Sequence, residues 1–338
     1  MSIISAWLRR CGIDPYLVLI VSMVGLAAVL PCRGVVAVGF SHAVVLVIGL
    51  LFFLYGARLS RAAVLGGLAD WRLQGTILLS TFVLFPLLGL AARVLVPDVL
   101  TPDLYRGVLF LCLLPSTVQS SIAFTSIARG NVAAAVCAAS ASSLFGVVLT
   151  PLLAGLVMAS HGGGISFGAV RDVALQLLAP FLAGQVLSGR LSGWLARHRS
   201  LTGLVDRGSI LLIVYAAFSE GVVNGIWSRL DLGSLASLLA VNLLLLAVVL
   251  TITTLASRAL GFARADEITI VFCGSKKSLA SGIPMINVLF SAQMAGLIVI
   301  PLMLFHQVQL MVCAVLARRY AAQGERMAGE PRRTAGIT

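Results

Sequence analysis

The sequence predicts an all-α polytopic membrane protein, and its composition is the first reason. Hydrophobic residues make up 59% of the 338 residues and charged residues 11%, whereas a soluble domain carries about 25% charged residues. The second reason is that apolar residues form runs of about 20, the length of a helix that crosses the hydrocarbon core. The third is that two of these runs contain helix-breaking and polar residues, as membrane helices do at binding sites.

Ten spans follow from the charges and the Pro or Gly signals at the ends of the apolar runs. They cover 15–31, 42–59, 75–96, 104–127, 131–159, 169–188, 208–227, 234–257, 267–290 and 293–317. The first span is short and follows Arg9 and Arg10. Because no small-residue cleavage pattern is clear there, we expect a mature helix rather than a signal peptide. The fourth and ninth spans are the interrupted ones.

The arginines predict the orientation. With the N-terminus in the cytoplasm, 17 of the 22 arginines fall on the inner side of the membrane. The outer ones are Arg33, Arg93, Arg106, Arg171 and Arg229. The positive-inside rule then predicts a multi-pass protein of the cell (cytoplasmic) membrane with both termini in the cytoplasm. Residues 319–338 are polar and contain Gly and Arg, so we expect a disordered cytoplasmic tail.

The net charge of +12 does not indicate a nucleic-acid partner. The arginines lie mainly in short connections between apolar runs, which fits membrane topology better than a binding patch. The two halves also share one layout, in which three regular spans precede an interrupted span and an apolar span follows. Five spans per half give opposite orientations, which predicts two inverted repeats, 1–159 and 160–318.

The ninth span holds the only two lysines of the chain, Lys276 and Lys277. A charged side chain in the bilayer costs about 3 kcal/mol on insertion scales, so it usually faces a cavity or a partner. The residues around the pair interrupt a helix and free backbone polar groups; they are Gly274, Ser275, Ser278, Ser281, Gly282 and Pro284. The alternative is that the lysines reach the headgroups from a helix end, although apolar sequence continues on both sides.

The fourth span is interrupted within 114–127. Its polar or helix-breaking residues are Pro115, Ser116, Thr117, Gln119, Ser120, Ser121 and Thr125. Such groups beside unwound backbone replace the hydration shell of a sodium ion or bind a polar solute. The alternative is that they pack or bond back to their own helix. Ser140 in the next span is a weaker candidate ligand.

Glu220 is the only carboxylate inside an apolar span. A buried carboxylate is neutralised by a proton or by a cation. We therefore consider a pair with Lys276 or Lys277 inside the membrane. The alternative is that Glu220 lies near the outer surface, since Arg229 follows nine residues later.

No enzyme class is indicated by the sequence. The chain has no GxSxG, HExxH or P-loop motif and no pair of intramembrane aspartates. Its four histidines and six cysteines are dispersed. We therefore expect no cofactor, no disulfide framework and no zinc site.

Four stretches resemble a known family: LFFLYGARLSRAAV at 51–64, PSTVQSSIAFTSIARGNVAAAVCAAS at 115–140, VYAAFSEGVVNGIW at 214–227 and FCGSKKSLASGIPMINVLF at 272–290. They are similar to the bile acid:sodium symporter superfamily, in particular its outlying bacterial branch, which is similar to the seventh member of vertebrate solute carrier family 10. The resemblance implies ten transmembrane helices in two inverted five-helix repeats. It also implies a core domain with two broken crossing helices, the fourth and ninth, and a panel domain of helices one, two, six and seven. A solute would bind between these domains.

The chain departs from that family at the sodium sites that the resemblance implies. Sodium-coupled members hold two sodium ions with an Asn on the fourth helix, hydroxyls on the fifth, and a Glu and a Gln on the ninth. In the ninth helix of this chain the Glu position falls on Phe272 and the Gln position on Lys276. A lysine ammonium repels sodium, so both sodium sites are in question.

The fourth and fifth helices depart from the family as well. The hydroxyl positions fall on Ala135 and Ala139, and the Asn position falls on Ile122 or Ser121, depending on a register shift of one residue. A vestigial sodium site would use Ser120, Ser121 and Ser140. The coupling ion, sodium or a proton, stays open.

The sequence thus predicts a secondary active transporter of an organic, anionic solute across the cytoplasmic membrane. Either the charge of Lys276 replaces an ion, or Lys276 and Lys277 bind the anionic solute. A non-transporting regulatory or scaffold protein is the alternative class, and a channel is a further one. The expected partners are a small organic solute and the lipid bilayer, without nucleic acid, and a homodimer stays open. The expected substrate- or ion-binding residues are Gln119, Ser120, Ser121, Thr125, Ser140, Glu220, Ser275, Lys276, Lys277 and Ser278.

Overall fold

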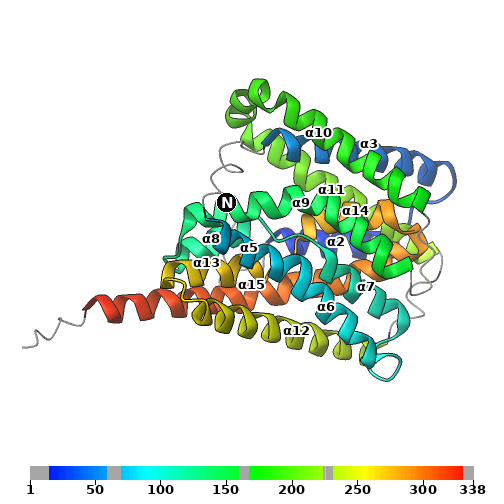
Figure 1. Cartoon of the computed structure of the whole chain (residues 1–338). Coiled ribbons are helices and arrows are strands. Elements are labelled where there is room, and N and C mark those ends of the chain that lie inside the picture. Colours follow the sequence, from blue (N-terminus) through cyan, green and yellow to red (C-terminus); the bar gives the residue numbers. More distant parts are fainter. Residues whose placement is uncertain (1–14, 59–69, 160–166, 224, 226–230, 330–338) are drawn as a thin grey trace, which may run out of the picture.

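The computed structural model describes residues 15–58, 70–159, 167–223, 225 and 231–329. Every regular element in these ranges is a helix, as the sequence predicts, and the helices form one bundle from which the C-terminal helix extends at one end (Figure 1). Six stretches of the described part are long and apolar enough to cross a membrane. These observations confirm a polytopic, helical membrane protein.

Several helices extend beyond the apolar runs that predict them. Those before residue 160 are α2 (Pro15–Val29), α3 (Gly34–Arg58), α5 (Trp71–Leu79), η1 (Ser80–Leu84), α6 (Phe85–Ala91), η2 (Ala92–Leu95), α7 (Pro102–Leu113), α8 (Gln119–Ile127) and α9 (Val132–Ala159). Those after residue 166 are α10 (Phe167–Arg197), α11 (Arg199–Val223), α12 (Leu232–Ala259), α13 (Arg264–Gly274), α14 (Leu279–Leu289) and α15 (Ala292–Gly329). Extra turns at the ends carry polar residues, such as Arg190 and Arg197 at the end of α10, which suit a helix that emerges into the headgroup region.

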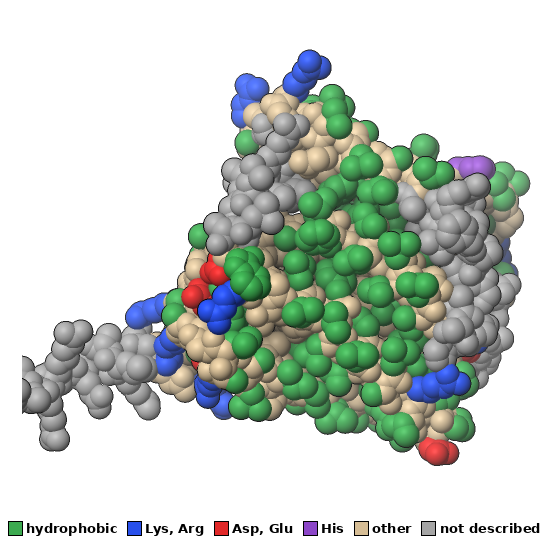
Figure 2. Space-filling model, viewed as in Figure 1, with side chains coloured by type: hydrophobic (Ala, Val, Ile, Leu, Met, Phe, Trp, Pro, Cys, Tyr) green, Lys and Arg blue, Asp and Glu red, His purple; other side chains and the backbone are tan. Residues whose placement is uncertain are grey.

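The outer surface of the bundle is apolar. Figure 2 shows hydrophobic side chains across the middle of one face, with the charged side chains at its margins. Large aliphatic residues are exposed outright, for example Val35 at 88% and Leu46 at 74%. A water-soluble protein rarely exposes so continuous an apolar surface, whereas a surface in contact with acyl chains requires it.

Helices α3 and α10 run side by side along one edge of the bundle (Figure 1). Two glycines, one from each helix, allow their backbones to approach closely. A Cβ atom on Gly56 would collide with the carbonyl oxygen of Phe181, and one on Gly184 would collide with that of Phe53. Small residues at such a crossing are the usual device of helix pairs in membranes.

Both predicted interruptions are confirmed. Helix α7 ends at Leu113 and α8 begins at Gln119, while α13 ends at Gly274 and α14 begins at Leu279. The first break follows from Pro115, because a proline disfavours helical backbone at the residue before it. Leu114 accordingly has the extended angles φ −75° and ψ 155°.

The prediction of a disordered tail at 319–338 is wrong for residues 319–329. Helix α15 continues to Gly329, so residues 319–329 are helical. This stretch, RYAAQGERMAG, consists mainly of Arg, Ala, Gln, Glu and Met, which are good helix formers, and it extends a helix that is already nucleated inside the bundle. Residues 330–338 lie outside the described part.

At the end of the bundle near residue 260, one carboxylate joins three helices. Arg258 of α12 donates two hydrogen bonds to Glu267 of α13, from Nε at 3.1 Å and from Nη2 at 3.0 Å. Tyr320 of α15 donates a third to Glu267 Oε1 at 2.9 Å. The Glu267 side chain is only 10% exposed, so these bonds replace most of its contact with water.

Glu267→Gln is therefore expected to lower the free energy of unfolding by about 1–3 kcal/mol, since a hydrogen bond to a charged group contributes about 1.5–3 kcal/mol. Thermal unfolding of the purified protein in detergent measures the loss. The matched control is Asp103→Asn, which removes a half-exposed pair with Arg106 and should change stability by less than about 1 kcal/mol. An equal loss in both variants would contradict the three-helix role of Glu267.

Candidate functional site

The two interruptions lie against each other in the interior and share their hydrogen bonds. The Ser278 N–H donates to the Pro115 carbonyl at 2.9 Å. In the other direction, Ser116 Oγ donates to the Cys273 carbonyl at 2.6 Å, and Ser121 Oγ donates to the Phe272 carbonyl at 3.2 Å. Each break thus satisfies backbone groups that the other leaves free, as buried helix ends require.

The Lys277 ammonium lies at the centre of this arrangement. Its Nζ donates to three backbone carbonyls, Thr81 at 2.8 Å, Cys112 at 2.9 Å and Leu114 at 2.7 Å. It also lies 4.1 Å from the centre of the Phe85 ring. Three acceptors at these distances need three N–H donors, which only the protonated amine has. The site therefore holds a positive charge surrounded by oxygen atoms.

Each of the three carbonyls is free for a local reason. Cys112 and Leu114 lie at the C-terminal end of α7, where the last carbonyls have no partner in the helix and carry its negative dipole end. The neighbouring Leu113 carbonyl accepts from Thr150 Oγ1 at 2.8 Å instead.

Thr81 lies in the π-helical turn η1. There the Phe85 N–H donates to the Ser80 carbonyl rather than to Thr81. In π geometry the donor for Thr81 would be residue 86, which is a proline and has no N–H. Pro86 thus leaves the Thr81 carbonyl to Lys277.

Lys276 has a different environment. Its Nζ donates to the Ser120 carbonyl in the first turn of α8 at 3.0 Å. The ammonium also lies 3.9 Å from the Phe124 ring centre and 5.5 Å from that of Phe272, so two aromatic faces attract it as cation–π partners. Both lysines are 0% exposed, so the alternative in which they reach the headgroups is wrong.

Gln309 of α15 holds the second interruption by its backbone. Its Oε1 accepts from the Lys277 N–H and its Nε2 donates to the Lys277 carbonyl, both at 3.0 Å. Gln309 is not among the residues expected at the site from the sequence. Its role is structural, but it lies at the site, and the only signal in the sequence is that it is an amide within an apolar span, as Gln307 also is.

The other predicted residues of the two interruptions contribute mainly to the local structure. Ser275 Oγ bonds back to the Val271 carbonyl at 2.6 Å, and Ser278 caps α14 by accepting from the Ser281 N–H at 3.2 Å. Thr125 is buried in α8. Gln119 is exposed at the start of α8 and lines a cavity described below.

Ser140 and Glu220 do not join the site. Ser140 is half-buried on α9, and it is Ser142 whose Oγ accepts from the Ser116 N–H at 2.9 Å. Glu220 is exposed on α11. Among the described residues it forms no ion pair with Lys276 or Lys277, so the proposed buried pair is wrong in this conformation.

A cavity of ≈ 720 Å³ borders the start of α8. Helices α3, α8, α10 and α11 supply its lining, which includes Arg58, Gln119, Thr202 and Arg207. The described residues of the lining include two guanidinium groups and no carboxylate, and guanidinium groups are suitable partners for an anion.

The site does not suit a sodium ion. Oxygen atoms are the ligands of hard cations, but the three carbonyls that converge near Lys277 already accept from its ammonium. Within the described residues, no group of three or more His, Cys, Asp or Glu side chains could hold a metal ion. The cation of this site is thus covalently part of the chain.

Two broken helices that meet inside a polytopic bundle, beside a polar cavity, are typical of membrane transporters. The profile of the SBF-like CPA transporter family matches residues 14–322. The chain belongs to that family, which confirms the resemblance inferred from the sequence.

Individual relatives agree with this assignment. The uncharacterised protein PA2026 of Pseudomonas aeruginosa is 53% identical over 309 residues, which cover 91% of this chain and 93% of that protein. The candidate symporter YfeH of Escherichia coli is 52% identical over 315 residues, 93% and 95% of the two chains. Sodium/bile acid cotransporter 7 of Xenopus tropicalis is 28% identical over 272 residues, 79% and 78% of the two chains.

Proposed function

We propose that this chain is a secondary transporter of an organic anion in which lysine ammonium groups replace the sodium ions of sodium-coupled relatives. The observation that carries the proposal is the Lys277 ammonium bound to three carbonyls, a coordination that an ion would otherwise complete. A tethered cation cannot be released with the solute. The transporter would therefore work without sodium, as a facilitator or with protons.

The architecture that we propose has ten transmembrane helices in two inverted repeats, 1–159 and 160–318. Two pairs of half-helices, α7 with α8 and α13 with α14, would form the broken fourth and ninth spans. Helix α3 contacts α10 and α11, and α2 contacts α11, which supports assigning these four helices to the panel domain. The other helices would form the core domain, with both termini in the cytoplasm.

We place the solute in the ≈ 720 Å³ cavity, because three of its four contributing helices belong to the proposed panel and one, α8, to the core. Movement of one domain against the other would open and close such a space. Arg58 and Arg207 would attract the carboxylate, sulfonate or sulfate of the solute, and Gln119 would add a polar contact. A scaffold protein would need neither the cavity nor the two buried charges.

The test is thermal unfolding of the purified protein at fixed pH, with sodium or choline chloride and a panel of carboxylates and sulfonates. We expect at least one anion to stabilise the protein, by about 2.7 kcal/mol at a hundredfold excess over Kd. The increase should be equal in sodium and choline. A sodium-specific increase would instead mean that a sodium site persists.

Arg58→Gln and Arg207→Gln should each weaken the binding of that anion about tenfold, which is about 1.4 kcal/mol. The matched control is Arg190→Gln, an exposed arginine on α10 that does not line the cavity. If no anion stabilises the protein in either salt, the scaffold class would replace the transporter. Equal binding by all three variants would place the solute elsewhere.

A further inference from the structure

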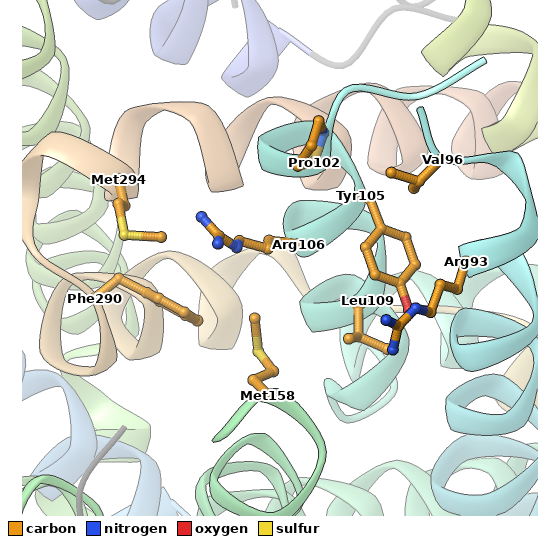
Figure 3. Close-up of a pocket in the computed structure, with 9 residues that line it drawn as sticks. All are labelled: Arg93, Val96, Pro102, Tyr105, Arg106, Leu109, Met158, Phe290 and Met294. Atoms are coloured by element: carbon orange, nitrogen blue, oxygen red, sulfur yellow. The ribbon is translucent and has the colours of Figure 1, made fainter. Parts of the chain in front are cut away.

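A second cavity, of ≈ 290 Å³, lies at the other end of α7 from the interruptions (Figure 3). Its lining comes from η2, α7, α9 and the region where α14 meets α15, none of which belongs to the proposed panel. The polar lining residues Tyr105 and Arg106 lie six or seven residues before Cys112, whose carbonyl binds Lys277, which is about 10 Å along the axis of α7. The cavity is thus distinct from the site described above.

Two guanidinium groups face this cavity. Figure 3 shows Arg106 extending into it and Arg93 at its edge. Arg106 pairs with Asp103 at 3.1 Å. No hydrogen bond or ion pair joins the Arg93 side chain to another residue of the described ranges. Among the described residues that line the cavity there are two guanidinium groups, of which Asp103 pairs with one, and this leaves an excess positive charge at the described wall.

The Tyr105 hydroxyl is the third polar group of the cavity. Tyr105 is only 6% exposed, and its Oη has no hydrogen-bond partner within the described part of the chain. The hydroxyl lies beside the Arg93 guanidinium (Figure 3). Buried hydroxyls nearly always have a partner, and an anionic oxygen at this point would accept from both donors.

The rest of the lining is apolar and comes from Val96, Pro102, Leu109, Met158, Phe290 and Met294. A cavity with cationic and phenolic donors at one side and aliphatic, thioether and aromatic groups elsewhere matches a ligand with two corresponding parts. We propose that this cavity binds an amphipathic anion, whose carboxylate, sulfonate or phosphate contacts Arg93, Arg106 and Tyr105 and whose apolar body contacts Met158 and Phe290. With the predicted orientation, the cavity opens toward the outer side of the membrane.

Two sources supply this chemistry, an anionic lipid of the outer leaflet and a free organic anion. The test uses the full chain in nanodiscs of phosphatidylcholine alone or with phosphatidylglycerol. Decanoate is the soluble probe and 1-decanol is its uncharged match. We expect decanoate to raise the unfolding temperature in phosphatidylcholine, and 1-decanol to have no such effect.

Substitutions of cavity residues test whether decanoate acts at this cavity. Arg93→Gln and Tyr105→Phe should each reduce the affinity for decanoate, about tenfold for the arginine, because a charge-assisted bond is lost. The matched control is Arg33→Gln, another exposed arginine of the predicted outer side, which should bind decanoate like the wild type. If phosphatidylglycerol abolishes the decanoate effect in the wild type, lipid occupies the same cavity; if it does not, the site prefers the free anion.

The proposal is overturned if decanoate and 1-decanol act alike. It is also overturned if Arg93→Gln and Tyr105→Phe bind decanoate as tightly as the wild type. Neither result depends on sodium or on the lysine site. The amphipathic-anion proposal and the transporter proposal can therefore be contradicted independently of each other.

Discussion

Replacing Lys277 with alanine is expected to leave the protein largely unfolded in the absence of an added cation. The change removes the ammonium and leaves the carbonyls of Thr81, Cys112 and Leu114 buried without a donor. Each unsatisfied buried group costs about 1–3 kcal/mol, so the three together cost about 3–9 kcal/mol. That loss is comparable to the total stability of a typical domain, about 5–15 kcal/mol.

A small amine should restore the Lys277→Ala protein. The substitution removes three methylene groups and the ammonium, which is the size of propylammonium. Propylammonium should therefore raise the unfolding temperature of Lys277→Ala in a saturable way and leave the wild type unchanged. Sodium should also stabilise this variant, because the freed carbonyls are suitable ligands for a hard cation. Thermal unfolding against the concentration of each cation, with choline as reference, measures both effects.

Lys277→Met is the matched variant for this rescue. Methionine fills most of the volume of the lysine stem but supplies no donor, so it should be unstable and should not respond to propylammonium. A Lys277→Met protein as stable as the wild type would contradict the role of the ammonium. A propylammonium effect of the same size in both variants would contradict binding in the vacated space.

The sequence is sufficient to predict the helical class, the membrane environment and the position of both interruptions. These features depend on side-chain pattern alone: long apolar runs, Pro115, and two lysines within one such run. The acceptors of Lys277 could not be predicted in the same way, because they are backbone carbonyls. Only the combination of Pro86 with a π-helical turn frees the Thr81 carbonyl, and that turn is a property of the folded helix.

The errors at Ser140 and Glu220 have geometric causes. Residues two apart on a helix lie about 200° apart around the helix axis, on nearly opposite faces. Ser142 therefore faces the first interruption, whereas Ser140 does not. Glu220 has the charge to pair with a lysine, but a sequence gives no rotation angle for α11. Backbone carbonyls of three segments accept the hydrogen bonds of the two ammonium groups, without any carboxylate.

Lys276→Met is expected to fold but to bind the anionic solute at least tenfold more weakly than the wild type. The lysine makes one charged hydrogen bond, to Ser120, and two aromatic contacts. Their loss should cost about 2–4 kcal/mol of stability, a smaller effect than that of Lys277→Ala. The affinity for the solute should also fall, because Lys276 binds the carbonyl of Ser120, and the preceding residue, Gln119, lines the cavity.

Lys276→Arg is the control for charge, since it retains a cation that bonds to a carbonyl and stacks on aromatic rings. Arginine should retain most of the solute affinity that methionine loses, as measured by anion titration of thermal stability. If Lys276→Met binds the anion like the wild type, then the charge at 276 serves the fold alone. The anion would in that case depend only on the arginines of the cavity. If both variants lose binding equally, the shape of the lysine matters more than its charge, and replacement of an ion at this position would be the wrong explanation.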